Sequence, residues 1–279
     1  MQVLRSELAR SKTPPPPWQL SPQEVLRYLG GHSPPVTESV QHRLDIAKIH
    51  DSGPAVARAI MLAPKFRTWF ASATSDILLV SPDGTGDKIS PASVFAASFF
   101  QCVVQLETAM PMIRFATTNG ENGQSWTVAT LLSDLIAQLL LAMDVDLQQW
   151  SAATSPYNHQ AALSSLDQVY LLSLLEYIIG TSPPSTIFCI LDDFRVLERA
   201  SSPQKVQAVM TKLQESVHMC GPEHNVVVKV LILTPDRRGE TMRYAPPAKV
   251  LRLVSEDDED RDEDAMTARK MARSLKYLQ

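Results

Sequence analysis

The chain has few of the sequence features that mark a secreted protein. Its 279 residues include three cysteines, Cys102, Cys189 and Cys220, which lie far apart. Nothing in that spacing suggests a disulfide framework. Neither a signal-peptide pattern nor an N-glycosylation sequon occurs. We therefore expect an intracellular, cytoplasmic protein.

An excess of positive charge is also missing. Lysine and arginine number 26 against 30 acidic residues, for a net charge of −4. This balance gives no electrostatic basis for nucleic-acid binding. Most of the imbalance is local, because residues 256–264 (EDDEDRDED) contain eight acids and one arginine. Such a block is typical of solvated linkers, and we assign residues 255–279 to an acidic linker with a short charged helix.

No apolar run is suited to crossing a membrane. The most apolar predicted helix, residues 163–179, spans 17 residues and contains Asp167 and Glu176, so it is a poor membrane span. Apolar residues make up 44% of the chain, which is enough to bury one large α/β core. We expect one principal domain and no membrane partner.

The N-terminal region is rich in proline, with seven among the first 35 residues, including four in succession at 14–17. This composition predicts a disordered leader over residues 1–35, although the PPPPW segment could also bind an SH3 or WW domain. Residues 36–75 are expected to form a helical extension. Its first part is predicted as two helical pieces within residues 36–62, broken at 52–54.

Strand-like and helix-like segments alternate through the rest of the chain. Strands are predicted at residues 76–81, 112–117, 185–191, 226–234 and 248–254, and intervening helices at 126–143, 163–179 and 203–219. Parallel neighbours require crossover connections, and these connections are helical. Residues 76–254 are therefore predicted to form a three-layer α/β domain with a doubly wound, mostly parallel five-stranded sheet.

The strand at residues 185–191 is continuously apolar and ends in two carboxylates, Asp192 and Asp193. Its composition predicts burial on both faces. Acids at the tip of such a strand could hold Mg²⁺ and polarise a water molecule. They could equally precede a helix whose first turn favours negative charge. Both interpretations remain open from the residues alone.

A glycine-containing loop follows the first strand, in the position of a phosphate-binding loop. Its sequence, PDGTGDKIS over residues 82–90, does not fit the pattern G-x-x-x-x-G-K-[ST]. Anchoring the pattern on Lys88 places Asp87 at the second glycine, and anchoring it on Gly86 places Asp87 at the lysine. A carboxylate in the cradle would repel phosphate. Ser90 and Pro91 resemble an N-cap and first helical residue, so the helix should begin after Lys88.

The same segments resemble the NACHT-like branch of the STAND P-loop NTPases, particularly fungal proteins of the nephrocystin-3-like N-terminal type. The resemblance runs from about residue 64 to 254. It rests on KFRTWF at 65–70, ILLVSPDGTGDKIS at 77–90, IFCILDD at 187–193 and KVLILTPDR at 229–237. The second of these departs from the family's intact Walker A sequence.

The resemblance implies a P-loop NTPase fold and a set of site residues. It implies Asp192 as a Mg²⁺ ligand, Asp193 as the acid that orients water, and Thr234, at the tip of a strand next to the acidic one, as a phosphate sensor. Nucleotide-binding roles would fall on Gly84, Thr85, Gly86, Lys88, Ser90, Thr234 and Arg237.

Two functions from different classes follow from these patterns. In the first, the degenerate loop leaves a signalling or assembly module without hydrolysis or cofactor, with protein partners and possible homo-oligomers. In the second, the chain is a divergent ATP or GTP switch, a nucleoside triphosphatase that uses Mg²⁺ with Lys88, Asp192 and Asp193.

Overall fold

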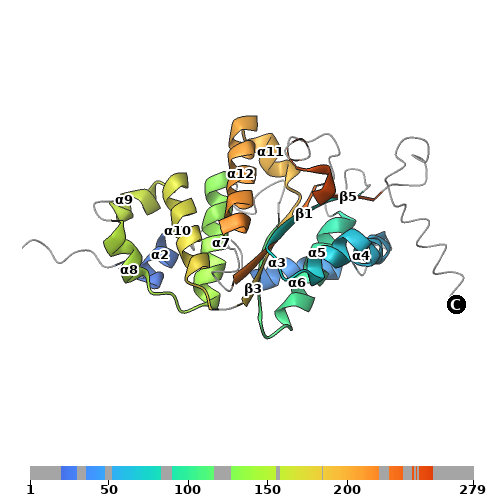
Figure 1. Ribbon diagram of the computed structural model, residues 1–279, viewed down its shortest axis with the longest axis horizontal. Coiled ribbons are helices and arrows are strands. Elements are labelled where there is room, and N and C mark those ends of the chain that lie inside the picture. Colours follow the sequence, from blue (N-terminus) through green and yellow to red (C-terminus); the bar gives the residue numbers. More distant parts are fainter. Residues whose placement is uncertain are drawn as a thin grey trace, which may run out of the picture.

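The computed structural model describes residues 20–29, 36–47, 52–82, 90–115, 127–154, 158–183, 185–219, 226–234, 241, 243 and 245–253. The described elements in chain order (Figure 1) are α2 (Pro22–Leu29), α3 (Val36–Ala47), α4 (Ser52–Leu62), α5 (Pro64–Ala71), β1 (Asp76–Ser81), α6 (Pro91–Val104), β2 (Ala109–Phe115), α7 (Val128–Ala142), α8 (Leu147–Ala153), α9 (His159–Ser164), α10 (Gln168–Gly180), β3 (Ser185–Asp192), α11 (Arg195–Ala200), α12 (Pro203–Met219), β4 (Val226–Leu233), the 3₁₀ helix η2 (Pro247–Lys249) and β5 (Val250–Arg252).

The five strands form one sheet in the order β2-β3-β4-β1-β5, and every neighbouring pair is parallel. The central strand β4 therefore separates β1 from β3. Helices α6, α7 to α10, and α11 with α12 lie between successive strands from β1 to β4, as crossover connections between parallel strands require. The predicted α/β class with a doubly wound five-stranded sheet is confirmed.

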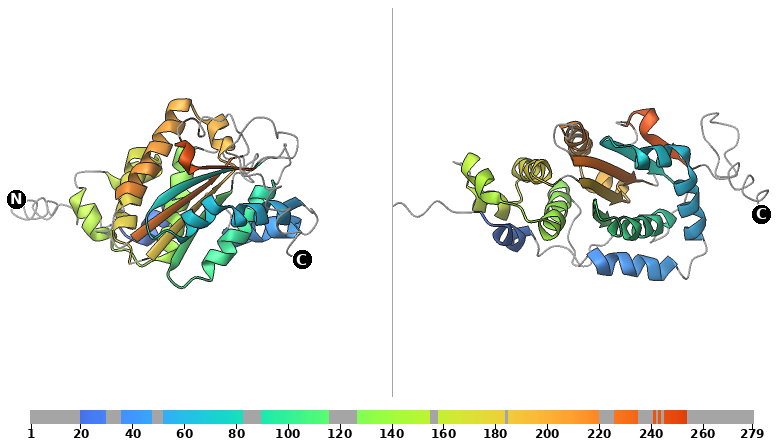
Figure 2. Two further views of the ribbon diagram at one scale, coloured as in Figure 1. Left: turned by 45° about the vertical axis from the view of Figure 1, so that its right-hand side comes forward. Right: turned by 60° about the horizontal axis from the view of Figure 1, so that its bottom comes forward.

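Helices cover both faces of the sheet, so the domain has three layers (Figure 2). Ile187, Cys189 and Leu191 of β3 pack toward α7, α10 and α12. Phe188 and Ile190 point the other way, into a cluster with α3, α4, α5 and α6. Successive strand side chains face opposite sides of a sheet, which explains why β3 has an uninterrupted apolar sequence.

The N-terminal leader is not disordered throughout. Leu20, Val25 and Leu29 have exposed fractions of 0%, 0% and 1%, and they pack in the same core as α7. The predicted disordered leader is therefore wrong for residues 20–29. Proline content describes the local chain, whereas the stability of α2 comes from apolar burial against a helix far along the sequence. The remaining leader residues lie outside the described part.

Two predicted helix boundaries also need correction. The expected helix at 163–179 is two helices, α9 and α10, because Leu166 adopts a left-handed φ of 51°. Asp167 then caps α10 by accepting a hydrogen bond from the Tyr170 amide (2.9 Å). In the N-terminal extension the break precedes Ser52, since residues 52–54 begin α4. The acidic residues 255–279 lie outside the described part.

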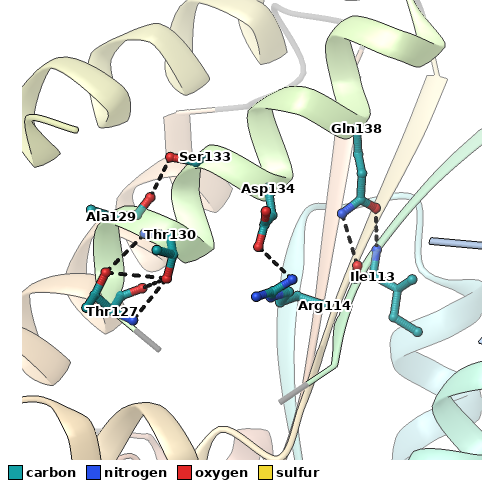
Figure 3. Close-up of polar contacts among 8 residues, drawn as sticks. All are labelled: Ile113, Arg114, Thr127, Ala129, Thr130, Ser133, Asp134 and Gln138. Atoms are coloured by element: carbon teal, nitrogen blue, oxygen red, sulfur yellow. Dashed lines mark hydrogen bonds and ion pairs between the residues drawn. The ribbon is translucent and has the colours of Figure 1, made fainter. Parts of the chain in front are cut away.

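Helix α7 is joined to the edge strand β2 by polar contacts (Figure 3). Its first turn is closed by a capping box between Thr127 and Thr130. Further along, Asp134 forms an ion pair of 2.8 Å with Arg114 of β2. None of the described helices is both long and apolar enough to cross a membrane.

Candidate functional site

Three buried polar residues lie where β1, β4 and β3 end. Ser81 is the last residue of β1, Thr234 directly follows β4, and Asp192 is the last residue of β3. Their exposed fractions are 0%, 0% and 1%. The Thr234 amide donates to the Val80 carbonyl oxygen (3.0 Å), which aligns the ends of β4 and β1. The crevice at the carboxyl ends of the strands is where open α/β sheets bind ligands.

These buried groups are unusual because their hydrogen-bonding capacity is unused. Within the part of the chain that the structure describes, neither the hydroxyls of Ser81 and Thr234 nor either carboxylate oxygen of Asp192 has a hydrogen-bond partner. Most buried polar side chains are hydrogen-bonded to protein or ordered water, and an unsatisfied one costs about 1–3 kcal/mol. Each of these groups could therefore bind a small polar ligand, a cation or water.

Asp192 is the central charge of this site. Burial raises the pKa of its carboxyl to about 6, while the nearby Ser93 hydroxyl and Arg43 guanidinium oppose that increase. Ser93 lies near enough to stabilise the charged carboxylate, although its hydroxyl does not reach hydrogen-bond geometry with either oxygen. Asp192 thus combines a buried location with free oxygens, which suits a cation ligand.

Asp193 is placed differently from its neighbour. Its φ of 46° turns the chain out of β3, and one carboxylate oxygen pairs with Arg195 of α11 at 3.1 Å. Its other carboxylate oxygen is buried without a partner in the described part. Asp193 does not cap α11, because the capping position is Phe194 and no side chain caps that helix. Half of its hydrogen-bonding capacity is therefore committed to a structural ion pair.

Helix α6 begins where the sequence predicts. The Ser90 hydroxyl accepts a hydrogen bond from the Ser93 amide (3.2 Å), and Pro91 is the first helical residue. The Ser90 and Ser93 hydroxyls are 3.1 Å apart. Ser90 is therefore a helix cap. The other loop residues assigned to nucleotide binding (Gly84, Thr85, Gly86 and Lys88) and Arg237 lie outside the described residues.

The position of Ser93 suggests a third register for the phosphate loop. In P-loop proteins the serine or threonine after the lysine shares Mg²⁺ with the acid of the neighbouring strand. Ser93 is the α6 hydroxyl beside Asp192. Aligning the pattern on Ser93 places Gly86 at the first glycine, Pro91 at the second and Ala92 at the lysine.

Sequence reasoning missed this register because it anchored the pattern on Lys88 or took Gly86 as the second glycine. The available signal was the spacing from Gly86 to Ser93, which matches the pattern. Thr234, by contrast, lies at the end of a strand next to the acidic one, as predicted.

The metal chemistry available here is limited. Within the described ranges, no group of three or more His, Cys, Asp or Glu side chains could hold a metal ion. Asp192 with Ser93 is a partial ligand set that would need water or a phosphate to complete it, which is usual for Mg²⁺.

Neither a family model nor a curated protein matches this chain.

Proposed function

We propose that this chain is a degenerate P-loop NTPase-like domain, of the NACHT type that its sequence resembles, and that it acts as a signalling or assembly module without hydrolysing nucleotide. The observation that carries this proposal is the position of Ser93 beside Asp192. In that register Ala92 and Pro91 replace the lysine and the second glycine of the phosphate loop. Protein partners, including further copies of the chain, are then the agents of function.

Pro91 and Ala92, in place of the second glycine and the lysine, lack groups that phosphoryl transfer requires. The loop lysine reaches the β- and γ-phosphates, and the backbone N–H groups of the loop cradle them. Alanine brings no charge, and proline has no N–H and a fixed φ. Since catalysis of this reaction is mostly positioning and charge stabilisation, both losses should reduce it strongly. The pairing of Asp193 with Arg195 further constrains the acid expected to orient water.

The second candidate, a divergent ATP or GTP switch using Lys88, Asp192 and Asp193, is favoured by a different observation. The buried oxygens of Ser81, Thr234 and Asp192, at the ends of three neighbouring strands, have no hydrogen-bond partner among the described residues, and such groups are commonly satisfied by water or a ligand. Asp192 and Ser93 would hold Mg²⁺, which would neutralise phosphate charge. The proposal and this alternative differ in whether nucleotide binds and turns over.

Turnover gives the first test. We expect the purified chain to release no more phosphate from ATP or GTP than an Asp193→Asn control. Multiple turnovers that the substitution abolishes would contradict the proposal and support the switch.

Restoring the loop gives the second test. The variant Pro91→Gly with Ala92→Lys restores the register aligned on Ser93, and calorimetric titration should show Mg²⁺-dependent ATP binding that the parent lacks. The matched control, Pro82→Gly with Asp87→Gly and Ile89→Ser, repairs the register aligned on Lys88 and should gain nothing. Tight binding by the parent, or a gain confined to the control variant, would refute the assignment of Ser93.

The assembly role needs its own measurement. Light scattering over a range of concentrations should give the same molar mass with and without Mg-ATP. A mass that changes on adding Mg-ATP would favour the nucleotide switch.

A further inference from the structure

Arg43 is a buried cation that the N-terminal helical extension brings to the candidate site. It lies on α3, which packs against α6 and β2, and its exposed fraction is 6%. Its guanidinium carbon lies 3.7 Å from the ring centroid of Phe115. One guanidinium nitrogen donates to the Ser39 carbonyl oxygen (3.1 Å). The guanidinium is therefore held over the end of β2.

The strand register places this cation next to Asp192. Phe115 and Asp192 are direct partners in the parallel pairing of β2 with β3. Phe115 packs in the cluster that contains Phe188 and Ile190, and Asp192, two residues after Ile190, faces the same side of the sheet. Neighbouring strands lie about 4.8 Å apart, so a group stacked on Phe115 flanks the carboxylate of Asp192.

Electrostatics agrees with this placement. The Arg43 charge acts on Asp192 in the direction that favours the ionised carboxylate. Among the residues that the structure describes, Arg43 is the cation with a resolved effect on Asp192. A buried carboxylate without a counter-charge is strongly destabilising. The nearby Arg195 is committed to Asp193 and Arg114 to Asp134.

We infer that Arg43 is the built-in counter-ion of Asp192, so that α3 supplies the positive charge that a metal ion would otherwise bring to the carboxyl edge of the sheet. The N-terminal extension is thereby part of the site, although it lies nearly 150 residues before Asp192 in the sequence. A divalent cation and Arg43 then compete for one carboxylate. This inference goes beyond the proposed function, because it concerns the nucleotide-free protein and holds whether or not nucleotide binds.

A double-mutant cycle on the full chain tests the pairing. Arg43→Met keeps an unbranched apolar side chain but removes the guanidinium, with its charge and its stacking on Phe115. We expect it to lower Tm near neutral pH by roughly 5–10 °C, because it leaves a buried carboxylate without its cation. In an Asp192→Asn background the same change should cost much less. Arg43→Lys should retain part of the stability.

Arg114→Met is the matched control, since Arg114 lies at the end of the same strand but pairs with Asp134. Its cost should be the same with Asp or Asn at position 192. If Arg43→Met prevents folding, recovery of the fold in Arg43→Met with Asp192→Asn would support the inference. An equal loss in both backgrounds would show that Arg43 contributes packing alone and would overturn it.

Competition is tested with MgCl₂ alone, without nucleotide. Millimolar Mg²⁺ should raise the Tm of Arg43→Met by several degrees relative to EDTA and leave the parent unchanged. Equal stabilisation of the parent, or none of the variant, would contradict competition. Because nucleotide is absent throughout, these outcomes are separate from the turnover and calorimetry that test the proposed function.

Discussion

The side-chain amide of Gln138 makes both hydrogen bonds that a further strand would make with Ile113. The Ile113 amide donates to Oε1 of Gln138 (2.9 Å), and Nε2 of Gln138 donates to the Ile113 carbonyl oxygen (3.0 Å; Figure 3). Ile113 lies on β2, an edge strand of the sheet, and Pro111 of that strand has no N–H to offer. Helix α7 therefore closes an edge that could otherwise pair with another chain.

Replacing Gln138 should expose that edge. Gln138→Leu leaves the amide and the carbonyl of Ile113 without partners, and we expect a loss of about 2–4 kcal/mol in the free energy of unfolding. Urea denaturation measures the loss, and light scattering should detect association through β2. Gln101→Leu, at an exposed position on α6, is the control and should change neither. If both variants behave alike, the hydrogen bonds of Gln138 do not stabilise the edge.

Helix α2 should contribute to global stability in spite of its place in the proline-rich leader. Leu29 is 1% exposed in the main core, so Leu29→Ala should cost about 2–4 kcal/mol. Leu141, which is 75% exposed on α7, provides the control, and Leu141→Ala should change stability by less than about 0.5 kcal/mol. Chemical denaturation followed by circular dichroism measures both. A negligible effect at Leu29 would show that α2 is not cooperative with the domain.

Removing the titrating group of Asp192 should change how stability depends on pH. Burial raises the pKa of Asp192 to about 6 from 3.8, a difference that corresponds to roughly 3 kcal/mol against the charged form in the fold. Asp192→Asn removes this pH-dependent cost and also leaves Arg43 without its counter-charge at every pH, so the stability of the variant relative to the parent should rise by up to about 3 kcal/mol between pH 3.8 and neutral pH. Asp144→Asn, at an exposed carboxylate, is the control.

The contribution of Asp192 to stability should decrease as the pH rises. Between pH 3.8 and about 6 the folded state binds more protons at Asp192 than the unfolded state does. Its contribution to stability is therefore full below pH 3.8 and is lost as the pH rises through about 6. The stability of Asp192→Asn relative to the parent should therefore fall on acidification towards pH 3.8. A difference in stability that is constant with pH would mean that burial does not raise the pKa of this carboxylate.

The contribution of Lys229 to stability should rise with pH in the alkaline range, whereas that of Asp192 falls with rising pH. Lys229 is 1% exposed, and its ammonium donates to the Trp69 carbonyl oxygen (2.7 Å). Burial lowers its pKa to about 8 from 10.5, with Asp76 opposing. Between these values the unfolded chain binds more protons, so this residue's contribution to stability grows as the pH rises from about 8 to 10.5.

The comparison variant is Lys229→Met, which has no titrating group at this position. The stability of the parent relative to Lys229→Met should increase over that alkaline interval in urea denaturation. Lys205→Met, at an exposed position on α12, should show no such trend relative to the parent. A flat difference for Lys229→Met would indicate that Lys229 titrates as it does in the unfolded chain.

The sequence by itself determined the features that depend on neighbouring residues. Continuously apolar strands predicted a sheet buried on both faces, and the helical segments between them predicted parallel pairing. Asp192 at a strand tip and Ser90 with Pro91 at a helix start are likewise local signals. Each follows from backbone propensity, side-chain periodicity or capping within a few residues, so each could be read without knowing what packs where.

Only the tertiary structure decided which groups meet at the site. The packing of α6 against β3 brings Ser93 beside Asp192, whereas Ser90 caps the helix. The packing of α3 brings Arg43 there from a segment that carries no site motif. Helix α2 is stable because its apolar face meets α7, although the local composition is that of a disordered leader. These outcomes depend on burial and charge between segments that are distant in sequence, which local patterns do not encode.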